Sequence, residues 1–458
     1  MADANRQSVL FPELFDRPAI VRFDQPKVTS DGGALLLGQL DRSLGVSQAL
    51  ASCVRDFRDP AKVTHPIQDL LQHRIFGIAC GYEDCNDVAR LSRDELFTSL
   101  VGRDTTKGET LASQPTLSRF ENGVNASDCL RMATELAELV FRRHQKRLGK
   151  RKVKRITIDF DGSVDHTHGM QQLSLFNGFY RSWCYFPLFC AVSFNDETTQ
   201  YAFAAALRSG RATESVASHS ILERVIPRLK RFFPKARILV RLDAGFKGSK
   251  LLELLEKHRV DYVIGLAGNA VLSRLSAAQM KETKRRARDT DETVTVFGET
   301  KYSAKSWSRE RRVVSKCQIV RLSGLSPREN QRYVVTNLRH RPDRVFEIYQ
   351  KRGDFENRIK ELKDGLDVDR TSCKNFVANQ FRLLLALAAY ILFQEIHLRV
   401  ARTRLANAQV WTLRDCLLKI GGIVSRSSRR IVVRLSESNP WADIWTKVAR
   451  SCGATSIA

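Results

Sequence analysis

The sequence lacks several features that would place it in familiar protein classes. None of its ten cysteines belongs to a CxxC pair, and the spacing of Cys80 and Cys85 beside His73 fits no common zinc site. We therefore expect a reduced chain with free thiols. The longest apolar run, Leu383–Phe393, is too short to cross a bilayer and predicts the buried face of a helix. Residues 1–7 lack the charged-then-apolar pattern of a secretory signal, so we expect a cytoplasmic protein.

Acidic residues are also scarce relative to basic ones. The 458 residues contain 75 Lys and Arg against 50 Asp and Glu, a formal net charge of +25. Such an excess favours a polyanionic partner. An anionic membrane surface would require a basic amphipathic helix or a lipidation motif, and the sequence contains neither. Composition therefore predicts a protein that binds nucleic acid and has no membrane partner.

Changes of pattern along the chain predict five segments. Residues 1–150 have apolar side chains at helical spacing and form a mostly helical N-terminal region. Strands alternate with helices in 151–272, which predicts the first part of an α/β core. Residues 273–344 contain strand-like pieces and predict a β-rich insertion. The core resumes as helix in 345–403, and 404–458 form a C-terminal region suited to oligomerisation or DNA contact.

The N-terminal region permits two interpretations. Its short helices and tight turns are typical of a helix-turn-helix DNA reader and equally of a structural bundle. At its end, Phe141–Arg155 contains nine Lys or Arg and no acid. A solvated linker is the ordinary explanation of a charge run, but in so basic a chain we favour contact with phosphates. Arg151, Lys152 and Lys154 are therefore candidate DNA-binding residues.

Two predicted strands end in acidic residues. In the strand that starts at Ile156, a period of two places Asp159 and Asp161 on one face. Asp243 ends the strand that starts at Ile238. Ligands of open α/β sheets gather at the carboxyl ends of strands, so these acids point to a shared site. Taken singly, each acid could equally be a turn residue or a helix cap.

A third acid lies on a later, basic helix. Tyr349, Arg352, Glu356 and Lys363 are spaced by three, four and seven residues, which places them within about 60° of one helix face. The ordinary explanation is a salt-bridged solvent face. In this chain the stripe has a second use, because its cations can hold phosphates while its carboxylate holds a metal. Two Mg²⁺ ions about 3.5–4 Å apart promote phosphodiester cleavage, and carboxylates are the hard ligands they need.

These motifs resemble those of the DDE transposases of bacterial insertion sequences, in the branch with a β-rich insertion before the last acid. Tyr349, Arg352, Glu356 and Lys363 match the Tyr-Arg-Glu-Lys signature of that branch without a gap. Asp161-Gly-Ser resembles the family's first acid and its neighbours, and Leu242-Asp243-Ala-Gly-Phe resembles the strand end of the second. Gly81-Tyr-Glu-Asp and Pro115-Thr-Leu-Ser-Arg-Phe-Glu-Asn resemble stretches of one group within the branch.

The resemblance implies an α/β, RNase H-like catalytic core and a site of three metal ligands, Asp161, Asp243 and Glu356. Two Mg²⁺ ions, or Mn²⁺ in their place, would serve each active site. Asp159 remains an alternative first acid, and we prefer Asp161 because the Gly-Ser that follows it matches the family.

The resemblance also implies that Tyr349, Arg352 and Lys363 contact phosphates near the cut. Relatives can stack a flipped base on a Trp of the insertion, for which Trp307 is the candidate; its other interpretation is a core Trp.

The function implied is cleavage of double-stranded transposon ends and joining of their 3′-hydroxyls to target DNA. A homodimer or higher oligomer would bridge the two ends, acting on the nucleoid of a bacterial cell. Two other hypotheses are a DNA-binding repressor without catalysis and a nuclease without strand transfer.

Overall fold

The computed structural model describes residues 9–11, 19–22, 24–25, 27–87, 91–149, 151–213, 215–246, 248–322, 324–427 and 429–455. The segment 1–7, considered above for a secretory signal, lies outside them. Compact packing divides the chain into two units, one formed by 1–43, 59–119 and 395–458 and the other by 44–58 and 120–394. These units cut across the predicted boundary at residue 150, because the helix that precedes it packs with the second unit.

The first unit joins N-terminal helices to the C-terminal segment. Strand β3 (Val28–Thr29) pairs with β15 (Gly422–Arg426), which pairs in turn with β16 (Ile431–Leu435). The buried Asp31 carboxylate accepts a hydrogen bond from Tyr82 Oη at 2.7 Å and lies 2.8 Å from Lys419 Nζ. The other strands and α-helices of this unit are β1 (Val9–Phe11), β2 (Ala19–Val21), α1 (Leu35–Leu44), α3 (Ile67–Ala79), α5 (Glu95–Leu100), α15 (Val410–Leu413) and α16 (Ala442–Ser451).

The second unit is built on an eight-stranded sheet, ordered β12-β13-β14-β11-β10-β4-β8-β9. Its strands are β4 (Arg155–Gly162), β8 (Leu188–Phe194), β9 (Tyr201–Ala206), β10 (Arg237–Leu242), β11 (Asp261–Leu266), β12 (Val294–Tyr302), β13 (Arg311–Val320) and β14 (Arg328–Thr336). Its helices are α2 (Val46–Ala51), α6 (Gln114–Gly123), α7 (Ala126–Leu148), α8 (Ser218–Phe232), α9 (Ser249–Lys257), α10 (Ala270–Leu275), α11 (Ala277–Arg286), α12 (Pro342–Gln350), α13 (Asp354–Leu366) and α14 (Phe376–Val400); α6 begins and α14 ends among residues of the first unit.

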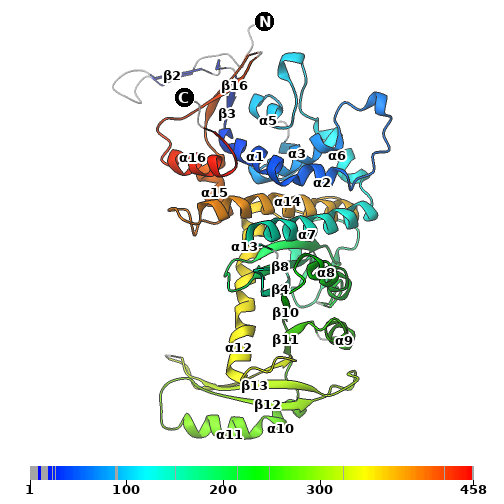
Figure 1. Cartoon of the computed structure of the whole chain (residues 1–458), viewed down its shortest axis with the longest axis vertical. Coiled ribbons are helices and arrows are strands. Elements are labelled where there is room, and N and C mark those ends of the chain that lie inside the picture. The colour runs from blue at the N-terminus through cyan, green and yellow to red at the C-terminus, as the bar shows by residue number, and fades with distance from the viewer. Residues whose placement is uncertain are drawn as a thin grey trace. The chain divides into compact units, whose positions relative to one another are not determined.

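Five of these strands form the core of the sheet. β4, β10 and β11 are parallel, while β8 and β9 precede β10 in the chain and extend the sheet antiparallel on the other side of β4. Figure 1 shows α8 and α9 on one side of the sheet and α12 and α13 on the other. This order and direction are those of an RNase H-like fold, which confirms the predicted fold class. The parallel strands are almost fully buried, as expected where helices cover both faces.

The insertion extends the same sheet. β12, β13 and β14 are antiparallel, and β14 pairs with the edge of β11 from Val263 to Leu266. Helix α11 packs on β12 and β13 around Met280 and Cys317. The strands of the β-rich segment therefore cover the edge of the RNase H-like core, which would otherwise expose unpaired backbone groups.

Helix α14 supplies much of the core. All residues of Leu383–Phe393 are buried, which confirms the prediction for that apolar run. Among the described residues, α14 is the one helix long and apolar enough to cross a membrane, and 83% of the relevant window is buried inside the protein.

Candidate active site

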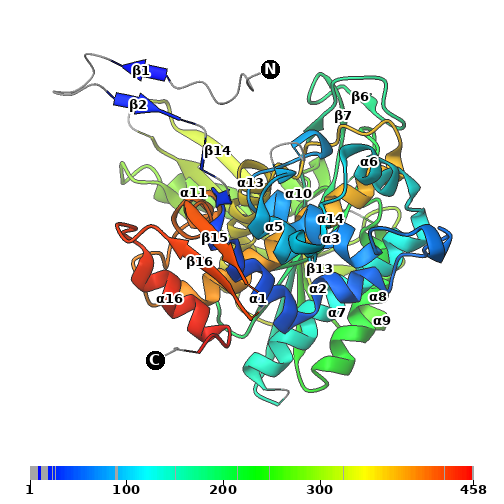
Figure 2. The same cartoon turned by 90° about the horizontal axis from the view of Figure 1, so that it is seen from above.

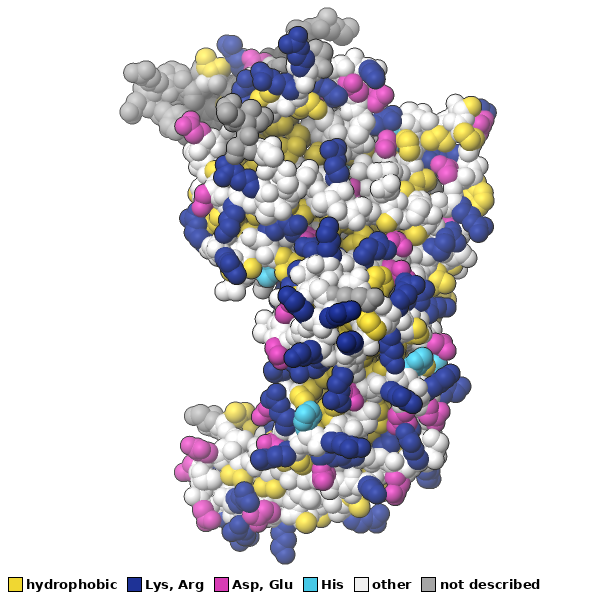
Figure 3. All heavy atoms as spheres, in the orientation of Figure 1, with side chains coloured by type: hydrophobic (Ala, Val, Ile, Leu, Met, Phe, Trp, Pro, Cys, Tyr) yellow, Lys and Arg dark blue, Asp and Glu magenta, His cyan; other side chains and the backbone are white. Residues whose placement is uncertain are grey.

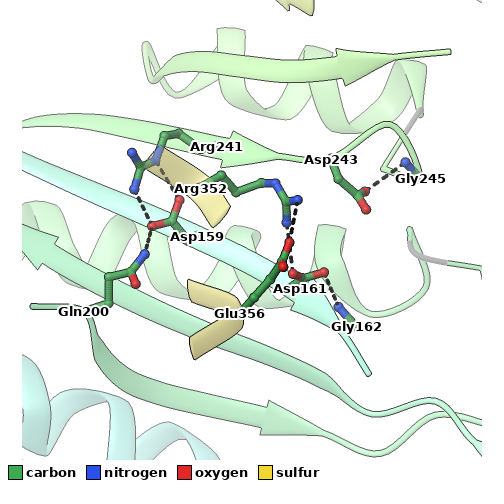
Figure 4. A network of polar contacts seen from close by, with 9 residues as sticks. All are labelled: Asp159, Asp161, Gly162, Gln200, Arg241, Asp243, Gly245, Arg352 and Glu356. Atoms are coloured by element: carbon green, nitrogen blue, oxygen red, sulfur yellow. Dashed lines mark hydrogen bonds and ion pairs between the residues drawn. The ribbon is translucent and has the colours of Figure 1, made fainter. Parts of the chain in front are cut away.

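The register of two parallel strands brings two of the predicted acids together. Arg241 of β10 lies opposite Asp159 of β4. Continued by two residues, the same register places Asp243 beside Asp161, where both strands end. The carboxyl edge of a parallel sheet is the expected place for a ligand site. Figure 4 shows these side chains at the strand ends, with Arg352 and Glu356 close to Asp161.

The carboxylate of Asp161 lies in a crowded electrostatic environment. It accepts hydrogen bonds from Gly162 N at 3.0 Å and from Arg352 Nη1 at 2.9 Å. Burial raises the pKa of Asp161 to about 6; the Arg352 charge opposes the rise, while the nearby acids Asp243 and Glu356 add to it. Asp161 is therefore held next to other negative groups, an arrangement that a cation would stabilise.

Asp243 is held by the turn that follows its strand. One of its oxygens accepts a hydrogen bond from Gly245 N at 2.8 Å, and the other projects from the turn (Figure 4). An acid can cap a turn in this way and still present an oxygen to a ligand, because a carboxylate accepts several hydrogen bonds or metal contacts. The turn role and the site role are thus compatible at this position.

The helix of the third acid is interrupted next to the site. Helix α12 ends at Gln350, a 3-10 turn covers Lys351–Gly353, and α13 begins at Asp354. The expectation of one regular helical stripe is wrong at this turn, for two reasons. Gly353 is a weak helix former, and Asp354 favours a new helix start through the helix dipole.

The interruption leaves Arg352 within reach of two acids. Its Nη2 lies 3.4 Å from Glu356 Oε1 while its Nη1 contacts Asp161. Burial disfavours the charge on Arg352, but Asp161, Asp243 and Tyr349 together raise its pKa. Arg352 therefore links the first and third acids, whereas Glu356 itself remains largely exposed.

Tyr349 approaches the second acid over a glycine that the sequence analysis did not single out. A Cβ added to Gly265 of β11 would lie 2.5 Å from Tyr349 Oη, 2.7 Å from Ala244 N and 3.1 Å from the carbonyl carbon of Asp243. Because Gly265 has no side chain, the backbone of the Asp243 turn and the Tyr349 hydroxyl can both pack against it. A glycine inside a predicted strand is the sequence signal for such a close approach.

Asp159 has a different environment from Asp161. It is fully buried and accepts hydrogen bonds from Arg241 Nε and Nη2, each at 2.7 Å, and from Gln200 Nε2 at 2.7 Å. Burial raises the pKa of Asp159, and Arg241 and Gln200 act against the rise. With its oxygens occupied inside the protein, Asp159 is a structural ion-pair partner, so geometry favours Asp161 as the first acid.

Lys363 lies near the same sheet edge but is engaged within the protein. Its Nζ donates a hydrogen bond to the Val164 carbonyl at 2.8 Å and lies 3.1 Å from Asp369 Oδ2. Lys363 thus has neighbours different from those of Tyr349, because the two residues are far apart along the helix. A phosphate contact by Lys363 would compete with these two partners.

The structure does not bring Trp307 to the three acids. Trp307 follows β12, whose last residue pairs with Arg311, and this end of the insertion lies beside the amino end of β11. The indole is half-buried, 5.6 Å from the ring of Tyr302 and 5.3 Å from the Arg311 guanidinium. It belongs neither to the buried core nor to the carboxyl edge.

The predicted basic contacts also lie at the amino edge. Arg151, Lys152 and Lys154 are exposed and precede β4, the strand that reaches Asp161 only at its far end. Part of the surrounding basic run is paired, since Arg147 contacts Glu197 at 2.7 Å. Lys and Arg side chains also gather over α12 and α13, as Figure 3 shows.

The three carboxylates suit a divalent metal by their chemistry. Mg²⁺ and Mn²⁺ prefer hard oxygen ligands and tolerate waters in the remaining positions. Within the described ranges, no group of three or more His, Cys, Asp or Glu is arranged to hold a metal ion. In this arrangement the Arg352 guanidinium contacts both Asp161 and Glu356 (Figure 4).

An RNase H-like core with two acids side by side at the carboxyl edge and a third on a late helix defines the class of DDE transposases. The family model "Transposase DDE domain group 1" matches residues 11–455 of this sequence. The chain belongs to this family. Its general function is therefore DNA transposition, and enzymes of this family act on DNA with divalent metal ions.

One solved structure similar to this chain is a piggyBac transposase in a synaptic complex with hairpin DNA. The sequences are 11% identical, the TM-score is 0.39, and the match covers 95% of this chain and 85% of that one. No curated protein matches the sequence.

Proposed function

We propose that this protein cleaves the ends of a transposon and joins their 3′-hydroxyls to target DNA. Asp161, Asp243 and Glu356 would hold two Mg²⁺ ions, for which Mn²⁺ could substitute. The observation that carries this proposal is the strand register that sets Asp243 beside Asp161, with Glu356 tied to Asp161 through Arg352. Bound metal would activate the attacking oxygen and stabilise the leaving oxygen.

The residues around the acids would position the DNA. The acidic neighbours of Arg352 favour its positive charge. Once a cation neutralises Asp161 and Glu356, the same guanidinium can donate hydrogen bonds to the scissile phosphate. Tyr349, wedged over Gly265, would fix the Asp243 turn and direct its hydroxyl to the same edge. Binding and orientation are thus tasks of Tyr349 and Arg352, while Lys363 would first have to leave Asp369.

We further propose double-stranded transposon ends and target DNA as partners, and a homodimer or higher oligomer that holds two ends. The net charge of +25 supports binding to DNA, since each phosphate contact releases counterions. We place this activity on the nucleoid, in the cytoplasm of a bacterial cell.

A strand-transfer assay tests the proposal. A pre-cleaved end, taken from short inverted repeats that flank the coding region, is incubated with plasmid and Mg²⁺. Joining is expected with the unmodified protein and is expected to vanish in Asp161→Asn, Asp243→Asn and Glu356→Gln, each of which should still bind the end. End binding without joining in the unmodified protein would favour a repressor, and cleavage without joining would favour a nuclease.

A further inference from the structure

The pairing of β4 with β8 continues past the candidate active site. Beyond the last register pair of these strands, Ser163 N donates to Pro187 O at 3.0 Å, and β5 (Asp165–His166) pairs with β7 (Ser182–Tyr185). β7 pairs in turn with β6 (Leu175–Asn177), and Figure 2 shows β6 and β7 as a hairpin. We call residues 163–187 the β5–β7 extension. It grows directly out of the strand that carries Asp161.

The β5–β7 extension exposes an unusual number of large apolar side chains. Phe179 is 87% exposed and Trp183 is 58% exposed. Phe176 packs edge-on against Trp183 with ring centroids 6.2 Å apart, and Phe179 packs edge-on against Tyr180 at 4.9 Å. The large apolar side chains exposed in the extension are Met170, Leu173, Phe176, Phe179, Tyr180 and Trp183. An exposed cluster of this kind marks a binding surface.

The charge around the cluster selects the kind of partner. Between His166 and Phe186 the sequence contains no Asp or Glu; Asp367 and Asp369 line a pocket beside His166–Gln171, the part of the extension that precedes the aromatic residues. Arg181 lies at the hairpin tip, and the exposed Arg211 donates to the Phe176 carbonyl at 3.3 Å. Aromatic faces among cations suit unpaired nucleic-acid bases, which stack on the rings while their phosphates meet the cations. A second copy of this chain, itself charged +25, would bring like charge to the same surface.

The cluster is held rigidly, as a stacking surface requires. Asn177 Oδ1 accepts from Phe179 N at 3.0 Å, and its Nδ2 donates to Gly210 O at 2.7 Å. A Cβ at Gly210 would lie 2.3 Å from the carbonyl oxygens of Cys184 and Leu175, so the hairpin rests on bare backbone. The hydrogen bonds of Asn177 and the packing of Gly210 against the Cys184 and Leu175 carbonyls therefore hold the aromatic cluster in place before any ligand binds. This lowers the entropy lost on binding.

We propose that the aromatic cluster of the β5–β7 extension stacks unpaired bases of the DNA strand processed at Asp161. The proposal rests on the proposed function, since it takes the DNA end as the substrate. Thr167 N donates to Trp183 O, which places Trp183 six residues beyond Asp161 along the ladder. That is about 20 Å at 3.3 Å per residue, a reach of roughly six nucleotides at 3.4 Å each.

The test compares paired with unpaired DNA. Two probes are used: a fully paired duplex, and the same duplex with a single-stranded tail of about ten nucleotides, a length within the range that one single-strand site covers. The tail carries one 2-aminopurine, whose fluorescence falls when it stacks. The variant is Phe179→Ala with Trp183→Ala, the conservative variant is Phe179→Trp, and the control is Phe57→Ala, an aromatic 79% exposed outside the extension.

The double variant is expected to weaken binding of the tailed probe by about 5- to 100-fold and to abolish the quenching. Its affinity for the paired duplex and its melting temperature should stay unchanged, and Phe179→Trp and Phe57→Ala should both behave like the unmodified protein. Equal losses on both probes, or unchanged quenching, would overturn the inference. A change of oligomeric state without DNA would also overturn it, in favour of a contact between copies. If the unmodified protein bound neither probe, the proposed function itself would fail.

Discussion

The Asp159 carboxylate and the Arg241 guanidinium form a two-pronged ion pair across neighbouring parallel strands, with both nitrogen–oxygen distances at 2.7 Å. Two residues further along the same strands lie Asp161 and Asp243. The same sheet face thus carries a closed ion pair inside the protein and, at its edge, two acids of like charge. Removal of one partner of the first pair would leave a buried charge without its counter-charge, whereas the two acids of the second pair repel each other and depend on Arg352 or a bound cation.

This difference predicts opposite effects for two substitutions on one strand. Asp159→Asn leaves Arg241 buried without its counter-charge and should cost about 3–5 kcal/mol of unfolding free energy. Asp161→Asn removes a charge that burial disfavours first and that Asp243 and Glu356 also repel, and Arg352 keeps its contact with Glu356, so stability should be unchanged or higher. Urea denaturation of both variants measures the difference. A stable Asp159→Asn protein that cannot join DNA, beside an active Asp161→Asn protein, would reassign the first acid.

Gly265 should be a positioning residue whose replacement affects catalysis more than DNA binding. In Gly265→Ala the new methyl group would meet the backbone of the Asp243–Ala244 turn and the Tyr349 hydroxyl. Backbone cannot yield as a flexible side chain does, so we expect strand transfer to fall by about 100-fold, the usual cost of a misplacement near 1 Å. Gly268→Ala is the matched control, because its Cβ would meet only the Tyr333 ring at 3.6 Å. Equal rates for the two variants would remove this role from Gly265.

Arg352 should compete with metal for the acids. Arg352→Ala removes a cation that contacts both Asp161 and Glu356, so affinity for Mn²⁺ should rise by about tenfold or more, while strand transfer falls because a phosphate contact is lost. Calorimetric titration with Mn²⁺ reads the first effect independently of activity. Arg344→Ala removes an arginine that pairs with Glu347 on α12 and should leave the affinity unchanged. Weaker Mn²⁺ binding by Arg352→Ala would show that the arginine supports the site instead.

Asp165 should make stability depend on pH. Burial raises its pKa to about 7; the hydrogen bond from Thr371 opposes the rise and Asp369 adds to it, while Lys363 and Arg382 oppose it. Because the folded state holds this proton more tightly than the unfolded chain, its contribution is complete below pH of about 4 and is lost as pH rises through about 7. The loss amounts to at most about 4 kcal/mol.

Asp165→Asn keeps an oxygen for Thr371 but cannot ionise, so its stability should be flatter between pH of about 4 and about 7 than that of the unmodified protein. Denaturation curves recorded across this range provide the measurement. Parallel pH profiles for the two proteins would show that Asp165 is not the responsible group.

The sequence was sufficient to place Asp161 and Asp243 at strand ends and to predict the type of sheet. Strand periodicity placed Asp161 and Asp243 at strand ends, and the rule for parallel sheets put these ends at one edge. Periodicity could not distinguish Asp159 from Asp161, because both share a face. The cross-strand partner Arg241 favours Asp161 as the first acid, and strand register is invisible in a single sequence.

Other features depend on contacts between distant segments. The direction in which β12 leaves the sheet decides that Trp307 lies at the amino edge, and no local pattern encodes it. The β5–β7 extension could not be predicted, because its aromatic residues occupy a stretch without helical or strand periodicity. Pairing of β3 with β15 joins residues near opposite ends of the chain, beyond what local propensity can indicate. The break at Gly353 was visible as a residue type, but its effect on the helix depends on packing.

The insertion is hydrogen-bonded to β11, the strand that packs against the Asp243 turn. β14 bonds to β11 over four register pairs, and Gly265, the residue under the Asp243 turn, lies opposite Val334 in that ladder. A hydrogen-bonded ladder transmits displacement from strand to strand. A force applied to the β12–β14 strands would therefore reach the Asp243–Ala244 turn through Gly265. Any partner that pulled on the insertion would therefore strain the Asp243–Ala244 turn.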